Sequence, residues 1–222
     1  MGILSPKIPA QLTRVDDFSS YVSEFLVEEL PIIEMECTDE KGVAGEFRKI
    51  DIRKSRFTNC TFTHCDFEKA SFVDVIFEAC DFSNSKFSEA YFERCQFSHC
   101  KCIGVDMSLT MIKSTKFEQS NFTYSSFNQT KMLDVFFDRI DFSEASMGEA
   151  KLKKFAAKNS LFVKNNFFQT LLAGVDFTGN ELIAPMVSSP PYELKGMMID
   201  QFQAADLIGL LGVIVKENME KA

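Results

Sequence analysis

The chain of 222 residues carries a hydrophobic period of five that runs from Phe47 to Leu182 without a change of phase. Of its 28 positions, 18 are phenylalanine, and nine of the other ten are Ile, Leu, Met or Cys. A period of five fits neither the turn of an α-helix nor the two-residue alternation of a strand. The pattern therefore indicates an internal structural repeat.

A second position of the repeat, two residues before each large side chain, is usually small, as at Cys60, Ala70 and Ser85. The positions between these two are mostly polar or charged. We expect the large and the small side chains to point into the core and the polar ones to face solvent. The core is then a column along the repeat axis, and the uninterrupted period favours one domain.

One pair of residues departs from this pattern. Ala157 is the only small residue at a large position, and Phe155 is the large aromatic at the preceding small position. A close-packed core disfavours both holes and overfilling, so the two exchanges should compensate in volume. We expect a distorted coil at this point.

Residues 47–182 resemble the pentapeptide-repeat family, whose members fold as a right-handed quadrilateral β-helix. The resemblance implies an all-β solenoid in which four repeats form one square coil. The 28 repeats then predict about seven coils within residues 46–184. At about 4.8 Å per hydrogen-bonded coil, the rod would be roughly 34 Å long.

A solenoid needs ends that cover its terminal coils, and we expect a short helical cap at each end. Residues 1–45 are predicted as an N-terminal capping segment with one helix over residues 16–30, Asp16 as its N-cap and Pro31 after its end. An extended segment from Pro31 to Glu36 would lead into the first coil. The apolar face of the predicted helix is Phe18, Val22, Phe25, Leu26 and Leu30.

Residues 185–222 are predicted as a C-terminal module with a helix from Asp200 to Leu211, Gly212 at its end, and a strand over Val213–Val215. Residues 196–215 resemble the terminal helix–strand module of the Qnr-type quinolone-resistance proteins. That resemblance implies a homodimer, and the alternative is a monomeric cap folded on its own coil. The predicted dimer interface is Met198, Phe202, Leu207, Leu210, Leu211, Val213, Ile214 and Val215.

The net charge of −8 is distributed unevenly along the sequence. The N-terminal 45 residues contribute −6 and the repeat region balances to zero. When positions are assigned by a 20-residue coil, one face collects a mild excess of acids over Arg48, Lys49, Lys69 and Lys86. The acids are Glu46 and the candidate binding residues Asp66, Glu68, Glu89, Asp106 and Glu149. An acidic balance without a basic aromatic groove disfavours direct binding of nucleic acid.

The Qnr-type resemblance also implies a function. Proteins of that group imitate duplex DNA and bind a type II topoisomerase, DNA gyrase or topoisomerase IV, which protects it from quinolones. Carboxylates on a rod can compete with DNA phosphates for a basic saddle. The unbroken register leaves no room for the projecting loops of many Qnr repeats. The alternative function is a structural or scaffolding repeat protein with another protein partner, because a repeat specifies a shape and no ligand.

No catalytic motif is present, and we expect neither an enzyme nor a cofactor or metal site. Five of the seven cysteines occupy small core positions, which indicates reduced thiols. Cys60, Cys80 and Cys100 are 20 residues apart and would stack, so a metal or redox ladder is the alternative interpretation. His64 and His99 fall on different faces and cannot join it.

The N-terminal sequence has neither a basic leader nor a long apolar run. The longest apolar stretch, from Leu207 to Val215, is about half of what a bilayer requires. We therefore expect a cytoplasmic protein without a membrane segment.

Overall fold

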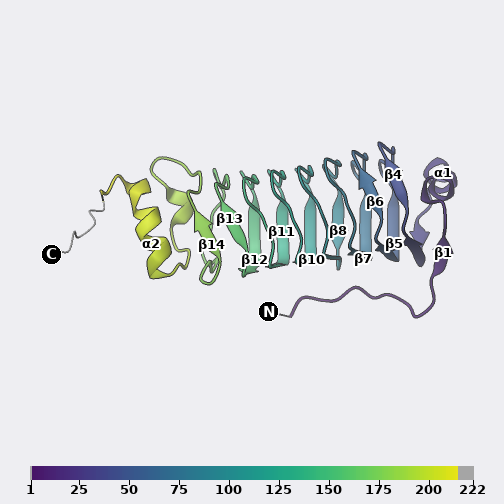
Figure 1. The fold of residues 1–222 in the computed structure, drawn as a ribbon, viewed down its shortest axis with the longest axis horizontal. Coiled ribbons are helices and arrows are strands. Elements are labelled where there is room, and N and C mark those ends of the chain that lie inside the picture. Colours follow the sequence, from purple (N-terminus) through teal and green to yellow (C-terminus); the bar gives the residue numbers. More distant parts are fainter. Residues whose placement is uncertain (1, 215–222) are drawn as a thin grey trace, which may run out of the picture.

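The computed structural model describes residues 2–214, which form a rod of stacked coils with a helix at each end (Figure 1). The α-helices are α1 (Phe18–Glu28) and α2 (Gln201–Leu207), and the 3₁₀-helices are η1 (Tyr192–Leu194) and η2 (Ile208–Leu211). The strands are β1 (Thr13–Val15), β2 (Ile32–Ile33), β3 (Met35–Thr38), β4 (Lys41–Val43), β5 (Asp51–Thr58), β6 (Thr61–Thr63), β7 (Ser71–Glu78), β8 (Tyr91–Glu93), β9 (Gln96–Ser98), β10 (Met111–Glu118), β11 (Lys131–Asp138), β12 (Lys151–Lys158), β13 (Leu161–Val163) and β14 (Glu181–Ile183).

Ten strands form one parallel sheet along the rod, in the order β1-β3-β5-β7-β8-β10-β11-β12, with β2 and β9 beside this path. Two further parallel pairs, β4-β6 and β13-β14, lie outside it. Residues 20 apart pair across neighbouring coils, as Ile52 does with Phe72 and Phe117 with Phe137. The predicted β-helix is confirmed, and it has about nine turns in all, more than the seven predicted for residues 46–184.

The additional turns arise partly because the repeat begins before Phe47. Ile32 pairs with Ile52 and Cys37 with Phe57, so both occupy large-residue positions of an earlier coil. Gly42 takes the next such position. Cys37 and Gly42 are not large, which is why the sequence period does not reveal this coil.

The core of the rod is a column of aromatic rings. Every phenylalanine of the five-residue repeat is at most 3% exposed. In the first half of the rod, rings on neighbouring coils stack face to face, with centroids 4.8 Å apart for Phe67 and Phe87 and 5.1 Å apart for Phe72 and Phe92. Such pairs stabilise by about 0.5–1.5 kcal/mol beyond their area burial.

The small position of the repeat also satisfies buried backbone carbonyls. The Sγ of Cys80 contacts the carbonyl oxygen of Phe57 at 3.6 Å, and the hydroxyl of Thr130 donates to that of Met107 at 3.2 Å. In both cases the acceptor is a large-position residue on the preceding coil. Because buried carbonyls require partners, this contact favours short polar side chains in the slot.

Two residues after each large position, the backbone turns the corner of the square coil in the left-handed region. The non-glycine residues of the coils at these corners have φ between 45° and 61°. Left-handed backbone is costly for L-residues and worst for β-branched ones. No Val, Ile or Thr has a positive φ in residues 2–214.

The coil of Phe155 and Ala157 keeps its register. Phe155 pairs with Val135 and Ala157 with Phe137, in line with the rest of β11 and β12. Both residues are buried, and the Phe155 ring lies 5.1 Å from that of Phe137. The expected distortion of the strand is therefore wrong, because the Phe155 ring occupies space next to the small Ala157 side chain.

The N-cap of helix α1 lies one residue later than predicted. Asp17, not Asp16, is the N-cap, and its carboxylate accepts the amide N–H of Ser20 at 2.9 Å. Asp16 instead forms an ion pair with Arg14 at 2.8 Å. The helix ends at Glu28, before the predicted Leu30, because Glu29 turns left-handed with φ 53°.

The first residue of α1 closes the N-terminal end of the aromatic column. Phe18 is fully buried, and its ring centroid lies 5.1 Å from those of Phe47 and Phe62 and 5.4 Å from that of Phe57. All three contacts are edge-to-face. Phe18 thus fills the N-terminal end of the core, next to the coil that contains Gly42.

At the C-terminal end, α2 begins as predicted with Asp200 as N-cap, in a reciprocal capping box with Gln203. It continues as η2 and ends at Gly212, which is left-handed with φ 74°. The predicted strand is absent at Val213 and Ile214. Val215, its third residue, lies outside the described residues.

Candidate protein-interaction surfaces

The predicted acidic face is one side of the rod, but its acids do not form a continuous stripe. Asp66 and Asp106 lie two coils apart in one column, and Lys86 lies on the coil between them, paired with both through backbone β-bridges. Glu68 lies on the same face as Asp66, and Glu89 lies on the next coil. The stacking therefore places a lysine in the middle of the acids.

Cations neutralise three of the five predicted acids. The guanidinium of Arg48 lies 2.6 Å from the Glu68 carboxylate and 3.3 Å from that of Asp66. The Nζ of Lys69 lies 3.1 Å from Glu68 and 3.5 Å from Glu89, and the hydrogen bond with Glu68 raises the pKa of Lys69. Exposed ion pairs contribute only about 0–1 kcal/mol each, so their main effect is on the surface potential.

The other two acids stand apart from this cluster. Asp106 accepts the amide N–H of Ser108 at 2.9 Å, and Glu149 accepts a hydrogen bond from the Gln129 side chain at 3.1 Å. Within residues 2–214, neither carboxylate forms an ion pair with a lysine or arginine. They are the members of the set whose charge is least compensated.

The predicted dimer interface is a largely exposed apolar surface at the C-terminal end. Phe202 is 76%, Leu211 66% and Ile214 85% exposed, and Met198, Leu210 and Val213 are exposed too. Leu207 differs because it is buried against its own chain. Beside it lies a groove of about 400 Å³ lined by Pro191, Leu194, Lys195, Met197, Ile199, Ala204, Leu207, Ile208 and Leu211.

Polar side chains of the same module cover the last coil. The carboxylate of Glu193, which is fully buried, accepts the amide N–H of Gln169 at 2.9 Å and the Ser188 amide and hydroxyl. The Gln203 side-chain amide donates to the carbonyls of Phe177 at 3.0 Å and Asn180 at 2.8 Å. These bonds satisfy backbone groups that have no further coil to pair with.

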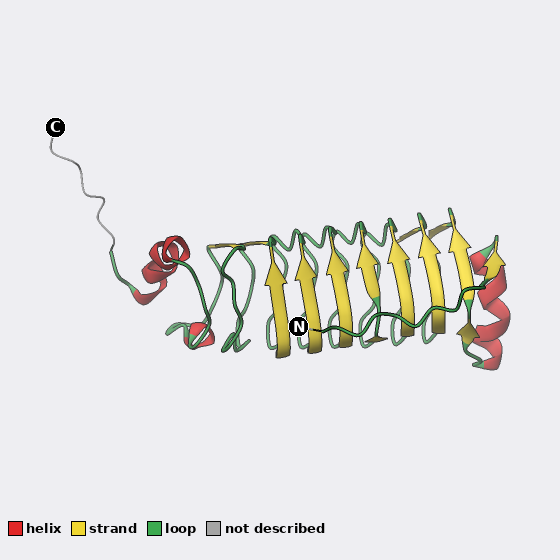
Figure 2. Ribbon diagram, turned by 90° about the horizontal axis from the view of Figure 1, so that it is seen from below, coloured by secondary structure: helices red, strands yellow, loops and turns green. Residues whose placement is uncertain are grey.

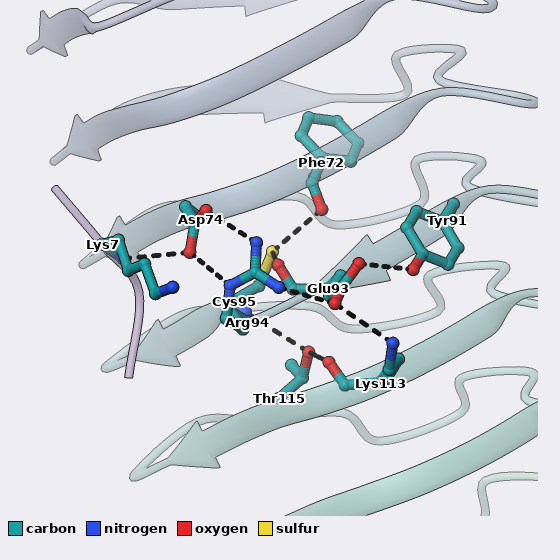
Figure 3. A network of polar contacts seen from close by, with 9 residues as sticks. All are labelled: Lys7, Phe72, Asp74, Tyr91, Glu93, Arg94, Cys95, Lys113 and Thr115. Carbon is teal, nitrogen blue, oxygen red and sulfur yellow. Dashed lines mark hydrogen bonds and ion pairs between the residues drawn. The ribbon is translucent and has the colours of Figure 1, made fainter. Parts of the chain in front are cut away.

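A buried ion pair on another face was not among the predicted sites. The Asp74 carboxylate and the Arg94 guanidinium form two hydrogen bonds of 2.7 and 2.8 Å, from one coil to the next (Figure 3). Burial alone would raise the pKa of Asp74, but the bonds from Arg94 and from the Lys7 amide hold it below its usual value. The signal available in the sequence was two opposite charges 20 residues apart.

This pair belongs to a larger network (Figure 3). Arg94 contacts Glu93 at 2.6 Å, and Glu93 accepts the hydroxyl of Tyr91 at 2.7 Å and lies 3.2 Å from Lys113. Burial, followed by the bond to Glu93, raises the pKa of Tyr91 to about 12. The network thus spans three coils.

All seven cysteines are buried and free. Cys60 Sγ lies 3.9 Å from Cys37 Sγ, and burial raises the pKa of Cys95 to about 12, so that thiol stays protonated. In the described part of the chain, no three Cys, His, Asp or Glu side chains converge as metal ligands. None of the helices between residues 2 and 214 is long and apolar enough to cross a bilayer.

The repeat region matches two models of one protein family. Residues 46–86 match "Pentapeptide repeats (9 copies)" and residues 70–134 match "Pentapeptide repeat region". These matches assign residues 46–134 to the pentapeptide-repeat family, and the parallel β-helix continues on both sides of them. A comparison with curated protein sequences finds no match.

Solved structures with the same fold include QnrB1, a plasmid-mediated fluoroquinolone resistance protein. A trypsin-treated QnrB1 variant aligns with 19% identity and a TM-score of 0.51, over 82% of this chain and 92% of that one. HetL, a pentapeptide-repeat protein involved in heterocyst differentiation regulation in the cyanobacterium Nostoc sp. strain PCC 7120, aligns with 12% identity and a TM-score of 0.39, over 84% of this chain and 98% of that one. The similarity to QnrB1 supports the fold.

Proposed function

We propose that this protein imitates duplex DNA and binds a type II topoisomerase, DNA gyrase or topoisomerase IV. The observation that carries the proposal is the rod itself, a stiff column of coils with carboxylates on its surface and a fold shared with QnrB1. Duplex DNA carries a charge about every 1.7 Å, and a basic saddle that binds it attracts other anionic rods. Asp106 and Glu149 are the predicted contacts with the least local compensation.

The test is a gyrase supercoiling assay with the purified protein. We expect inhibition that weakens with added salt and with the combined substitutions Asp66→Asn, Glu68→Gln, Glu89→Gln and Asp106→Asn. This variant also leaves Arg48 and Lys69 without their partners, so the local charge becomes positive. The matched control neutralises four acids on another face: Asp81, Asp141, Glu144 and Glu181. Equal inhibition by the two variants, or none by the wild-type protein at micromolar concentration, would reject the proposal.

Protection from quinolones is a separate part of the proposal. The coils keep their register without projecting loops between Asp51 and Lys158. Drug-stabilised DNA cleavage by gyrase measures protection directly. A decrease in drug-stabilised cleavage on addition of the protein would support protection. Inhibition of supercoiling without that decrease would support binding to gyrase without protection.

We further propose that the C-terminal module joins two rods. The exposed Phe202, Leu211 and Ile214 support this, because apolar surface of this kind favours burial in an interface. Leu210→Asp combined with Val213→Asp should convert a dimer to a monomer on a sizing column. The control is Leu109→Asp with Met111→Asp, which changes two exposed apolar residues in the middle of the rod. Unchanged elution of the first variant would reject this interface.

A scaffolding protein with a different partner is the second candidate. The ion pairs of Arg48 and Lys69 favour it, since they remove much of the negative potential that DNA imitation needs. An inactive wild-type protein in the gyrase assay would support this candidate.

A further inference from the structure

Residues 2–12, here called the N-terminal strap, run along the outside of the rod. From the helical cap they cross the strands and end near the middle of the rod (Figures 1 and 2). Residues 8–12 lie beside Arg56 and Thr58, and residues 2–6 lie beside Gln96 and Phe136. The strap therefore covers one edge of several successive coils.

The strap is held by few contacts. Because it crosses the strands, it cannot extend their ladder, and one hydrogen bond joins it to the coils in the described structure. The amide N–H of Lys7 donates to Asp74 Oδ1 at 3.0 Å. No strap residue is buried, and Ile3, Pro6 and Ile8 are only half-buried. Spaces of about 290 and 390 Å³ lie along it, so the strap fills its groove incompletely.

The acceptor in this groove is fixed by the coils and not by the strap. Two hydrogen bonds from Arg94 orient the Asp74 carboxylate, and Glu93 in turn holds Arg94. Asp74 belongs to β7, Glu93 is the last residue of β8, and Arg94 lies in the turn that follows β8. The carboxylate is therefore in place before any segment binds, and it accepts a backbone amide irrespective of the side chain.

The floor of the groove beyond Asp74 is amphipathic. Phe136 points outward from β11, and the Lys116 Nζ lies 5.9 Å from the centre of its ring. The segment seated there contains Pro6 and Pro9, on either side of the Lys7 amide donor. Proline-containing extended chains lose little entropy on binding, since their backbone is already restricted.

We propose that this groove, formed by Asp74, Gln96, Lys116 and Phe136, binds an extended proline-containing segment of a partner protein. The strap occupies the groove in cis and must be displaced by that segment. Its contacts identify the chemistry of the ligand: one amide N–H for Asp74 and small apolar residues on both sides. The inference is independent of topoisomerase binding, which we assign to another face.

The test uses a fluorescent peptide with the sequence of the strap, GILSPKIPAQL, and the full-length protein. A tethered segment competes at an effective concentration in the millimolar range, so the wild-type protein should bind the peptide weakly. In the strap variant Ile3→Asp with Ile8→Asp, anisotropy should report binding at least about tenfold tighter. Circular dichroism checks that the coils remain folded. Equal peptide affinity for both proteins would overturn the proposal.

Two further variants locate the peptide. In the strap-variant background, Phe136→Asp should abolish binding, whereas Phe168→Asp, which changes an exposed phenylalanine on another face, should preserve it. Equal effects of the two would overturn the assignment of the groove.

A modified peptide tests the amide contact without changing the protein. N-methylation at the position of Lys7 removes the donor to Asp74, and we expect a loss of about tenfold in affinity. Unchanged affinity would contradict recognition by Asp74. A wild-type dimer that the strap variant loses on a sizing column would assign the groove to the strap of a second copy, and would overturn the proposed partner.

Discussion

The two ends of the rod are closed by different kinds of side chain, aromatic at the N-terminal end and polar at the C-terminal end. Each must cover a terminal coil whose strand edges and core side chains would otherwise meet water. At the N-terminal end, Phe18 inserts into the aromatic column and is fully buried. At the C-terminal end, Glu193 and Gln203 bind the backbone of the last coils, while Phe202 remains 76% exposed.

The N-terminal cap thus closes the hydrophobic core, whereas the C-terminal cap leaves an apolar surface exposed. An aromatic plug uses the apolar face of its helix in the core, so α1 has less apolar surface to offer a partner. A cap that satisfies the backbone with polar side chains can turn its apolar residues outward. The comparison explains why we place the dimer interface at the C-terminal end, and four predictions test it.

The largest effect is expected from the same substitution at both ends. Phe18→Ala should lower the free energy of unfolding by about 3–5 kcal/mol, because it leaves a cavity among Phe47, Phe57 and Phe62. Phe202→Ala should change it by less than about 0.5 kcal/mol at a concentration where the chain is monomeric. Denaturation with urea measures both. Similar losses would show that the two ends do not differ in this way.

Removal of the buried charge at the C-terminal cap should have the next largest effect. Glu193→Gln removes the charge and one of the two oxygens that accept hydrogen bonds from Gln169 and Ser188, at a cost of about 1–3 kcal/mol. The matched change at the other end is Glu40→Gln. The carboxylate of the half-buried Glu40 accepts a hydrogen bond from the amide N–H of Phe18 at 2.9 Å. We expect the smaller loss there in thermal unfolding. The reverse order would contradict a polar C-terminal closure.

Acid should weaken the C-terminal cap through the same residue. Burial opposes ionisation of Glu193, but hydrogen bonds from Ser188 and Gln169 outweigh it and lower its pKa from 4.5. A carboxyl group whose pKa is lower in the folded state stabilises the fold at pH values above its unfolded-state pKa. That stabilisation is lost as the pH falls through its folded-state pKa. The melting temperature should therefore fall less between about pH 5 and pH 3 in Glu193→Gln than in the wild-type protein. Parallel curves would exclude this contribution.

The smallest effects concern the residues that end the two helical caps. Glu29 ends α1 and Gly212 ends η2, and both are left-handed, with φ of 53° and 74°. Glu29→Gly should raise stability by about 0.5–1 kcal/mol, and Gly212→Ala should lower it by a similar amount. Differential scanning calorimetry can resolve these shifts. Changes of the same sign would show that backbone strain does not govern these ends.

Part of the fold could be predicted because its signals are local and repeated. Large residues of the period pair with one another 20 residues apart, as Ile52 does with Phe72 and Phe117 with Phe137, so the 18 phenylalanines give one consistent interpretation. The N-cap at Asp200 and the glycine at the end of η2 were likewise predictable from their immediate neighbours. Asp16 was a wrong N-cap because Asp17 offers the same chemistry one residue later.

The candidate sites were less predictable, because they depend on which side chains the stacking brings together. The sequence placed Asp66, Glu68 and Glu89 on one face but did not show that Arg48 and Lys69 would pair with them. It indicated an apolar C-terminal module but not that Leu207 would face inward.

By itself, the sequence determined the internal repeat and its inward-facing column of phenylalanines, and the resemblance of that repeat to a known family implied the β-helix. Only the tertiary structure decided that Cys37 and Gly42 continue the repeat, that Asp74 and Arg94 form a buried pair, and that residues 2–12 lie over them. These features depend on contacts between segments distant in sequence. The first two follow the 20-residue spacing of the coils, but Cys37, Gly42, Asp74 and Arg94 do not belong to the repeated hydrophobic pattern, so the period does not reveal them.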